Sequence, residues 1–122
     1  MKKSEKNSAY NKPSLTAEAR RDLKDIQVYI SVEQESPQNA LKVIEAILNR
    51  IERLISFPNT GTMLASIVGF STDYRFVRAA GYLVFYRNEN SQIIIDRIIH
   101  GKRDYVKILF PEEEGSGNSH YK

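Results

Sequence analysis

Residues 74–100 decide the fold of this chain, and they read YRFVRAAGYLVFYRNENSQIIIDRIIH. Three segments, 74–78, 82–87 and 93–99, are rich in aromatic and β-branched side chains and are short enough to be strands. The stretches between them, 79–81 and 88–91, contain the Gly, Asn and Ser residues that are typical of turns. We therefore predict three consecutive strands that pair as an antiparallel meander.

A first helix is predicted before the meander. Thr16 can cap its start, because a threonine hydroxyl accepts a hydrogen bond from a free backbone N–H. Apolar residues then recur every three or four positions to about Val32, which is the spacing of one helix face. The residues on this face are Ala19, Leu23, Ile26 and Ile30.

A second helix is predicted to start at Ser36 and Pro37, with Ser36 as its cap and Pro37 at its first position. A wide apolar stripe follows through about five turns and ends before Pro58. Because only residues 34–36 separate the two helices, we expect them to pair as an antiparallel hairpin. The stripe consists of Ala40, Leu41, Ile44, Ile47, Leu48, Ile51, Leu54 and Ile55, and we expect it to be buried.

Two helices followed by three strands indicate an α+β fold, in which an N-terminal antiparallel helical hairpin packs on one face of a mainly antiparallel sheet. Residues 13–15 could add a short edge strand, and the pattern over 63–70 is ambiguous. Both faces of the meander carry large apolar side chains, but two helices can cover only one of them. We expect the other face to be open to a partner, unless a terminal segment folds over it.

The length of 122 residues allows one domain. We predict a disordered extension over 1–9, a single domain over 10–110 and a flexible acidic, Gly/Ser-rich tail over 111–122. The absence of cysteine excludes disulfides, thiolate nucleophiles and cysteine-based metal sites. Two histidines, His100 and His120, do not favour a zinc site, and the sequence has no Gly-rich phosphate loop. We expect neither a metal nor a small-molecule cofactor.

The net charge of the chain is +3 and its pI is about 9.2. Residues 75–107 contain seven Lys or Arg against three Asp or Glu, so this half is the basic one. No apolar run reaches the roughly 18 residues that span a bilayer, and no apolar signal core follows the basic N-terminus. We therefore expect a cytoplasmic protein that does not bind membranes.

Residues 100–105 follow the last strand and gather a histidine, two cations, an acid and a phenol. Together with Arg78 they could form an endonuclease site, because Lys and Arg stabilise charge on a phosphate while His or Tyr moves a proton. The alternative is that the cations are solvated and that His100 makes a local hydrogen bond. The residues alone favour this alternative.

Five stretches, by their order and spacing, resemble the ParE/RelE superfamily of type II toxin–antitoxin toxins. They are TAEARRDLKDI from Thr16 with Tyr29-Ile30, SPQNA from Ser36, IERL from Ile51 with FPNTG from Phe57, YLVFYR from Tyr82, and IDRIIHGKRD from Ile95. The resemblance covers about residues 10 to 110. It implies a small α+β toxin that is encoded beside an antitoxin, whose C-terminal segment wraps around the toxin and neutralises it.

Two positions bear on the choice between the branches of this superfamily. RelE-like members cleave mRNA on the ribosome, and the resemblance places their arginine at Leu83 and their late tyrosine at Leu109. Leucine can neither hold a phosphate nor transfer a proton, and Arg103 alone matches a basic position of the nuclease set. The long helical hairpin and the ending Arg97–Asp104 are more similar to the ParE branch, which implies plasmid stabilisation and non-catalytic inhibition of DNA gyrase.

The resemblance thus favours a binding protein over an enzyme, with an antitoxin and DNA gyrase as partners. No catalytic residue is assigned, and the residues expected to bind the target are Arg78, His100, Lys102, Arg103 and Tyr105. One alternative is a RelE-like interferase that acts on ribosome-bound mRNA through Arg78, His100, Arg103 and Tyr105. Another is a degenerate toxin that retains only antitoxin binding.

Overall fold

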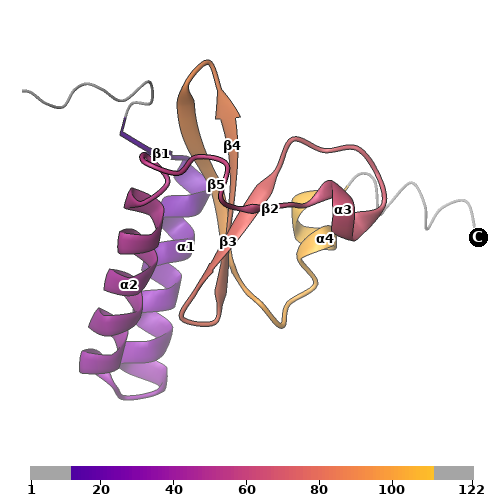
Figure 1. Cartoon of the computed structure of the whole chain (residues 1–122). Helices are drawn as coiled ribbons and strands as arrows, with labels where there is room; N and C mark the ends of the chain where they lie inside the picture. The colour runs from indigo at the N-terminus through magenta and orange to yellow at the C-terminus, as the bar shows by residue number, and fades with distance from the viewer. Residues whose placement is uncertain (1–11, 112–122) are drawn as a thin grey trace, which may run out of the picture.

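Two helices lie against one face of a five-stranded sheet, and a computed structural model describes this arrangement for residues 12–111 (Figure 1). The α+β class is therefore confirmed. The predicted extension over 1–9 lies outside the described residues, as does all of the predicted tail except Pro111. Within residues 12–111, no helix is long and apolar enough to cross a membrane.

Helix α1 (Ala17–Val28) continues into a π-helical turn, η2 (Tyr29–Glu33), so the helical segment ends close to the predicted Val32. The predicted cap is confirmed, since the Thr16 hydroxyl accepts a hydrogen bond from the N–H of Ala19 at 3.1 Å. The same hydroxyl donates to the carbonyl of Asp96 at 3.0 Å. Thr16 therefore fixes both the start of the helix and its position on the sheet.

Helix α2 (Pro37–Glu52) starts at the predicted proline, and Ser36 occupies the N-cap position as predicted, although its side chain makes no cap hydrogen bond. The helix ends at Glu52, before the last two residues of the predicted apolar stripe, Leu54 and Ile55. Leu41 and Leu48 are 61% and 43% exposed, although we predicted both to be buried. Each helical residue is rotated by about 100° from the one before it. When Ile47 points into the core, Leu48 therefore points beside it, into solvent.

The strand order in the sheet is β1-β5-β4-β3-β2. Strands β3 (Arg75–Ala79), β4 (Tyr82–Glu89) and β5 (Gln92–His100) form the predicted antiparallel meander. The predicted edge strand is present as β1 (Ser14–Leu15), which runs parallel to β5, and β2 (Thr62–Met63) pairs antiparallel with β3. Positive φ angles at Ala80 and Gly81 are those of the tight hairpin turn between β3 and β4.

A bulge in β5 was not predicted. Phe85 is opposite Arg97 whereas Tyr86 is opposite Ile95, so Asp96 is an extra residue in β5. Side chains on a regular strand alternate between faces, and the bulge shifts this alternation by one residue. As a result, Ile95 and Ile98 both face the helices although they are three positions apart.

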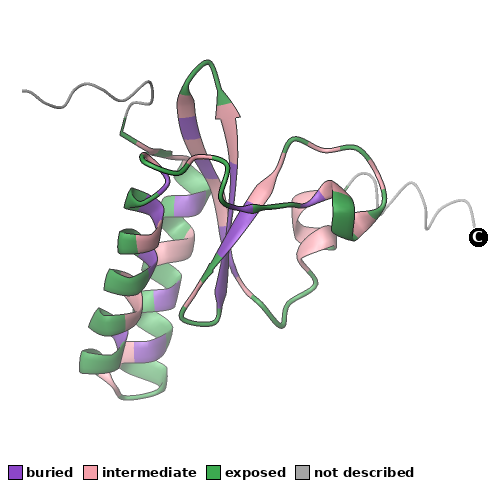
Figure 2. Cartoon of the chain, viewed as in Figure 1, coloured by how far each residue is buried: buried purple, intermediate pink, exposed green. Residues whose placement is uncertain are grey.

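Apolar clusters lie on both faces of the sheet, whose strands are largely buried (Figure 2). We call the side of α1 and α2 the helix face and the opposite side the far face. On the far face, helices α3 (Ala65–Val68) and α4 (Tyr105–Leu109) and their flanking segments cover the strands. The far-face cluster consists of Leu64, Phe76, Leu83, Phe85 and Ile99, with Val68, Tyr74, Tyr105, Ile108, Leu109 and Phe110 packed against it.

The prediction that this face is open is therefore wrong, and the alternative of a segment folded over it is confirmed. The residues from Tyr105 to Phe110 act as the cover, and Phe110 makes edge-on ring contacts with Phe70 and Tyr74 at 5.1 and 5.9 Å. From the sequence, Tyr105 was predicted only as a functional residue. A five-residue helix is too short to show the apolar periodicity that identifies longer helices.

Candidate functional site

A pocket of about 660 Å³ lies where the tip of the helical hairpin meets the end of the sheet. Its apolar lining comes from Ile26 and Ile30 on the first helical segment, Val43 on α2 and Ile98 on β5. Its polar lining comes from both sides and includes Asp22, Asp25, Tyr29, Tyr82, His100, Lys102 and Arg103. We call this the hairpin-tip pocket.

The end of β5 positions the basic side of this pocket. The N–H of Gly101 donates to the carbonyl of Gly81 at 2.9 Å, and the N–H of Arg103 donates to the carbonyl of His100 at 3.0 Å. The N–H of Lys102 donates to Nδ1 of His100 at 3.2 Å. This local hydrogen bond is the one expected if the segment is a surface turn.

Aromatic side chains form the next part of the pocket. Tyr82 is buried and meets the His100 ring edge-on, with a centroid distance of 5.1 Å. Burial, and to a smaller extent the neighbouring Tyr29, raises the pKa of the Tyr82 phenol. Tyr29 lies on the π-helical turn and is 48% exposed. The pocket therefore offers aromatic surface and neutral hydrogen-bonding groups beside its cations.

Many of the cations in the basic half of the chain are engaged in the fold. Arg97 forms two hydrogen bonds with Asp22, at 2.8 and 3.0 Å, and these bonds raise the pKa of the guanidinium. Arg87 bonds Asp96 at 2.6 Å, which has the same effect on its pKa. Arg75 donates to the carbonyl of Gly61 at 2.9 Å.

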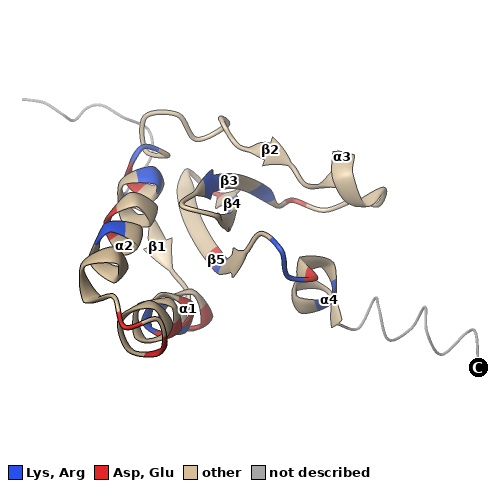
Figure 3. Cartoon of the chain, turned by 90° about the horizontal axis from the view of Figure 1, so that it is seen from below, with Lys and Arg blue, Asp and Glu red and all other residues tan. Residues whose placement is uncertain are grey.

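In contrast, Lys102 and Arg103 are exposed and form no ion pair within residues 12–111. Figure 3 shows a basic stretch between β5 and α4, whereas the helical hairpin carries both acidic and basic residues. Two exposed cations beside an apolar and aromatic pocket form a surface suited to binding an acidic protein segment.

The structure separates the five residues expected to bind a target. His100, Lys102 and Arg103 line the hairpin-tip pocket. Arg78 is on the far face, with its guanidinium 5.8 Å from the centroid of the Phe76 ring. Tyr105 packs on Phe85 with ring centroids 5.3 Å apart, as part of the far-face cluster.

Both leucines discussed in the sequence are apolar packing residues. Leu83 is only 3% exposed within the far-face cluster, and Leu109 packs against that cluster. Both side chains pack against aromatic and aliphatic residues, and Arg78 lies opposite Leu83 in the pairing of β3 with β4. Within residues 12–111, no group of His, Asp and Glu side chains could hold a metal ion.

The acidic and aromatic side of the pocket was not predicted from the sequence. Asp22, Asp25 and Tyr29 are spaced by three and four positions, which places them on one side of a helix. This spacing was visible in the sequence. Their position opposite Lys102 and Arg103 was not, because it depends on how α1 packs on β5.

Comparisons with known proteins agree with the fold and with the sequence patterns. The family model described as ParE toxin of type II toxin-antitoxin system, parDE, matches residues 14–105. Among solved structures, the chromosomal ParDE TA system from P. aeruginosa matches with a TM-score of 0.59 and 25% identity, covering 73% of this chain and 96% of that chain. No curated protein gives a significant match. The family match includes both long helices, the meander and the basic side of the hairpin-tip pocket.

Proposed function

We propose, from the premise that the chain belongs to the ParE toxin family of type II toxin–antitoxin systems, that it inhibits DNA gyrase by binding it. We further propose that a cognate antitoxin neutralises it and that it acts in the cytoplasm. In this proposal the toxin acts by occupying a surface of its target and has no chemical step of its own.

The placement of Leu83 and Leu109 is the observation that carries this proposal. A ribosome-dependent nuclease needs groups that hold the phosphate and move protons, and loss of one such group lowers the rate by about 10²–10⁴-fold. Here the two positions contribute apolar side chains to the packing of the far face. The aromatic ring of Tyr105 lies against Phe85, on the far face, rather than in the pocket with His100.

The hairpin-tip pocket supports binding as the mode of action. Lys102 and Arg103 are exposed, they lie beside aromatic and apolar surface, and within residues 12–111 no acidic side chain pairs with them. Cations of this kind speed up association with an acidic partner and are screened by salt. We propose that these two residues, with His100, contact the target.

A gyrase supercoiling assay tests the proposal with a pair of matched variants. We expect Lys102→Ala/Arg103→Ala to raise the toxin concentration for half inhibition by roughly two- to thirtyfold, since two exposed ion pairs contribute about 0.2–1 kcal/mol each. Arg20→Ala/Lys42→Ala removes the same charge from exposed positions on α1 and α2 and should leave inhibition unchanged. Equal inhibition by both double variants contradicts the role of the pocket, and absence of inhibition by the wild type contradicts the proposed target.

A further inference from the structure

The edge of β3 is only partly paired. On one side, β3 pairs with β4 along its whole length, from Arg75 to Ala79. On the other side, β2 pairs only with Arg75 and Phe76. Residues 77–79 therefore have no neighbouring strand on this side among the described residues. An unpaired strand edge presents N–H and C=O groups that can pair with another extended chain.

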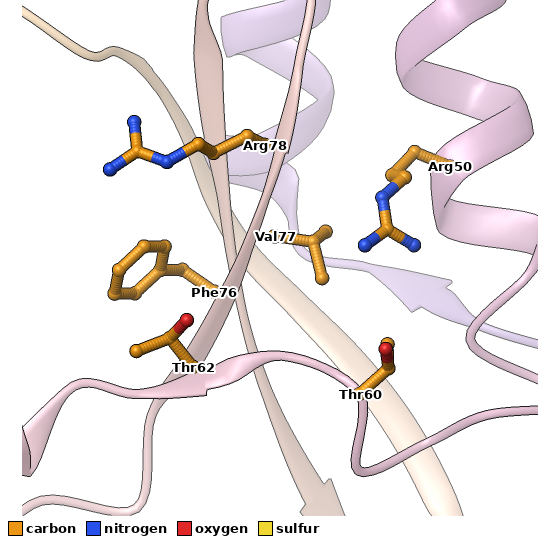
Figure 4. A pocket seen from close by; sticks show the side chains of 6 residues that line it. All are labelled: Arg50, Thr60, Thr62, Phe76, Val77 and Arg78. Carbon is orange, nitrogen blue, oxygen red and sulfur yellow. The ribbon is translucent and has the colours of Figure 1, made fainter.

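A pocket of about 220 Å³ lies at this open edge, between β3, α2 and the segment that leads into β2 (Figure 4). Its lining residues are Arg50, Thr60, Thr62, Phe76, Val77 and Arg78. In Figure 4, Arg78 and Phe76 point to one side of β3, whereas Val77 points to the other side, toward the guanidinium of Arg50. The open edge therefore runs between two arginines, one on each face of the sheet.

Charge and strand geometry together define what fits this edge. Neither Arg50 nor Arg78 forms an ion pair with an acidic residue of the described chain. Successive side chains of a strand point to opposite faces of a sheet. A strand added beside residues 77–79 would therefore direct one side chain toward Arg50 and the next toward Arg78. Two consecutive acidic residues complement this arrangement.

We propose that the open edge of β3 binds an extended segment of the antitoxin by strand addition, and that two consecutive acidic residues of this segment pair with Arg50 and Arg78. This inference rests on the proposed function only in taking an antitoxin as the partner. The added strand is short, because β2 occupies one end of the edge and the hairpin turn at Ala80 and Gly81 closes the other. Backbone hydrogen bonds hold the segment, and the two arginines select its charge.

Hydrogen exchange on the full chain, alone and with its cognate antitoxin, tests strand addition directly. We expect the amide of Arg78, which points away from β4, to exchange rapidly in the free toxin and to be protected in the complex. Exchange that is equally fast in the complex would overturn the inference. If the antitoxin does not bind the wild-type chain at all, the inference and the proposed partner both fail.

Charge reversal tests the recognition of acidic residues. Arg50→Glu/Arg78→Glu should weaken antitoxin binding by roughly tenfold or more, because like charges at an interface repel. Lysine in place of the two acidic residues of the antitoxin should restore part of the affinity. The control Arg20→Glu/Lys42→Glu has the same net charge and exposed positions away from this pocket. Equal affinity of the two double variants, each with an unchanged melting temperature, contradicts the inference.

A different occupant is the acidic stretch Glu112–Glu114 of the same chain. Hydrogen exchange in a variant that ends at Pro111 distinguishes binding of the antitoxin from binding of this acidic stretch. The Arg78 amide should exchange equally fast in the free full-length chain and in the shortened one. Protection that exists in the free full-length chain and disappears on truncation would assign the edge to this segment and overturn the inference.

Discussion

Truncation of two adjacent residues on α2 should have very different effects on stability. Ile47 is fully buried between the helices and the sheet, whereas Leu48 is 43% exposed. Replacing a buried isoleucine by alanine removes apolar contacts and leaves a cavity, at a cost of about 2–5 kcal/mol. At Leu48 the space opens to solvent, so no closed cavity forms. The remaining loss of apolar contact should be about 1 kcal/mol or less.

Thermal unfolding followed by circular dichroism measures this difference. For a domain near this size, about 1 kcal/mol corresponds to roughly 4–8 °C in melting temperature. Ile47→Ala should therefore lower the melting temperature by at least about 8 °C, and Leu48→Ala by less than that. Leu48→Asp should also fold, which reverses the expectation from the apolar stripe alone. Equal losses at the two positions would refute the assignment of Leu48 to the solvent side of α2.

Three other substitutions test the packing and the electrostatics of the fold. Gly61→Ala should cost about 1–3 kcal/mol in urea unfolding, because a Cβ there would lie 2.6 Å from the Tyr86 hydroxyl and 2.8 Å from the Phe76 carbonyl. In the control Gly101→Ala the nearest such atom is 3.4 Å away, and a similar loss there would contradict the steric explanation. Asp22→Asn should cost about 1.5–3 kcal/mol, because it weakens charged hydrogen bonds to Arg97 and the N–H of Ile98, whereas exposed Asp25→Asn should change stability by about 0.5 kcal/mol or less. Burial, followed by the charge and hydrogen bond of Asp96, raises the pKa of Tyr74 to about 12. The unfolded phenol loses its proton first, near its usual pKa of about 10, so wild-type stability should fall between about pH 10 and 12. Tyr74→Phe should fall less steeply over that range, and identical slopes would contradict the raised pKa.

Elements with a long periodic pattern could be predicted from the sequence. The spacing of Ala19, Ile26 and Ile30 identified the first helix, and Thr16 marked its start correctly. The aromatic and β-branched runs identified β3, β4 and β5 within one or two residues. These patterns are local, because burial on one face imposes a regular spacing on the residues themselves.

Features that depend on tertiary packing could not be predicted in the same way. The exposure of Leu41 and Leu48 depends on how much of α2 the sheet and α1 cover. The position of α4 over the far face depends on contacts between residues distant in sequence, such as Tyr105 and Phe85. Helix α4 is too short, and helix α2 too evenly apolar, for the sequence to indicate which of their residues face the core.

The residues of the candidate site were predicted only in part, because the sequence shows which residues are neighbours along the chain but not how the elements pack. His100, Lys102 and Arg103 are neighbours in the sequence and remain together in the pocket. Arg78 and Tyr105 were grouped with them by chemistry, but the alternation of strand faces and the path of the chain place both on the far face. Residues that are neighbours in the sequence stay together in the fold. Residues that are grouped only by their chemistry come together only if the strand order and the path of the chain place them on the same face.

Titration of the wild-type toxin into parallel gyrase supercoiling and ribosome-dependent mRNA cleavage assays tests the central claim most directly. Because the proposed mechanism is occupancy, inhibition of supercoiling should become complete near or above one toxin per gyrase, and primer extension should show no new mRNA ends. An enzyme would act through turnover, far below one molecule per target. Codon-specific mRNA cuts at low toxin concentration that disappear in Arg103→Ala, with gyrase unaffected, would contradict the account and establish an interferase instead.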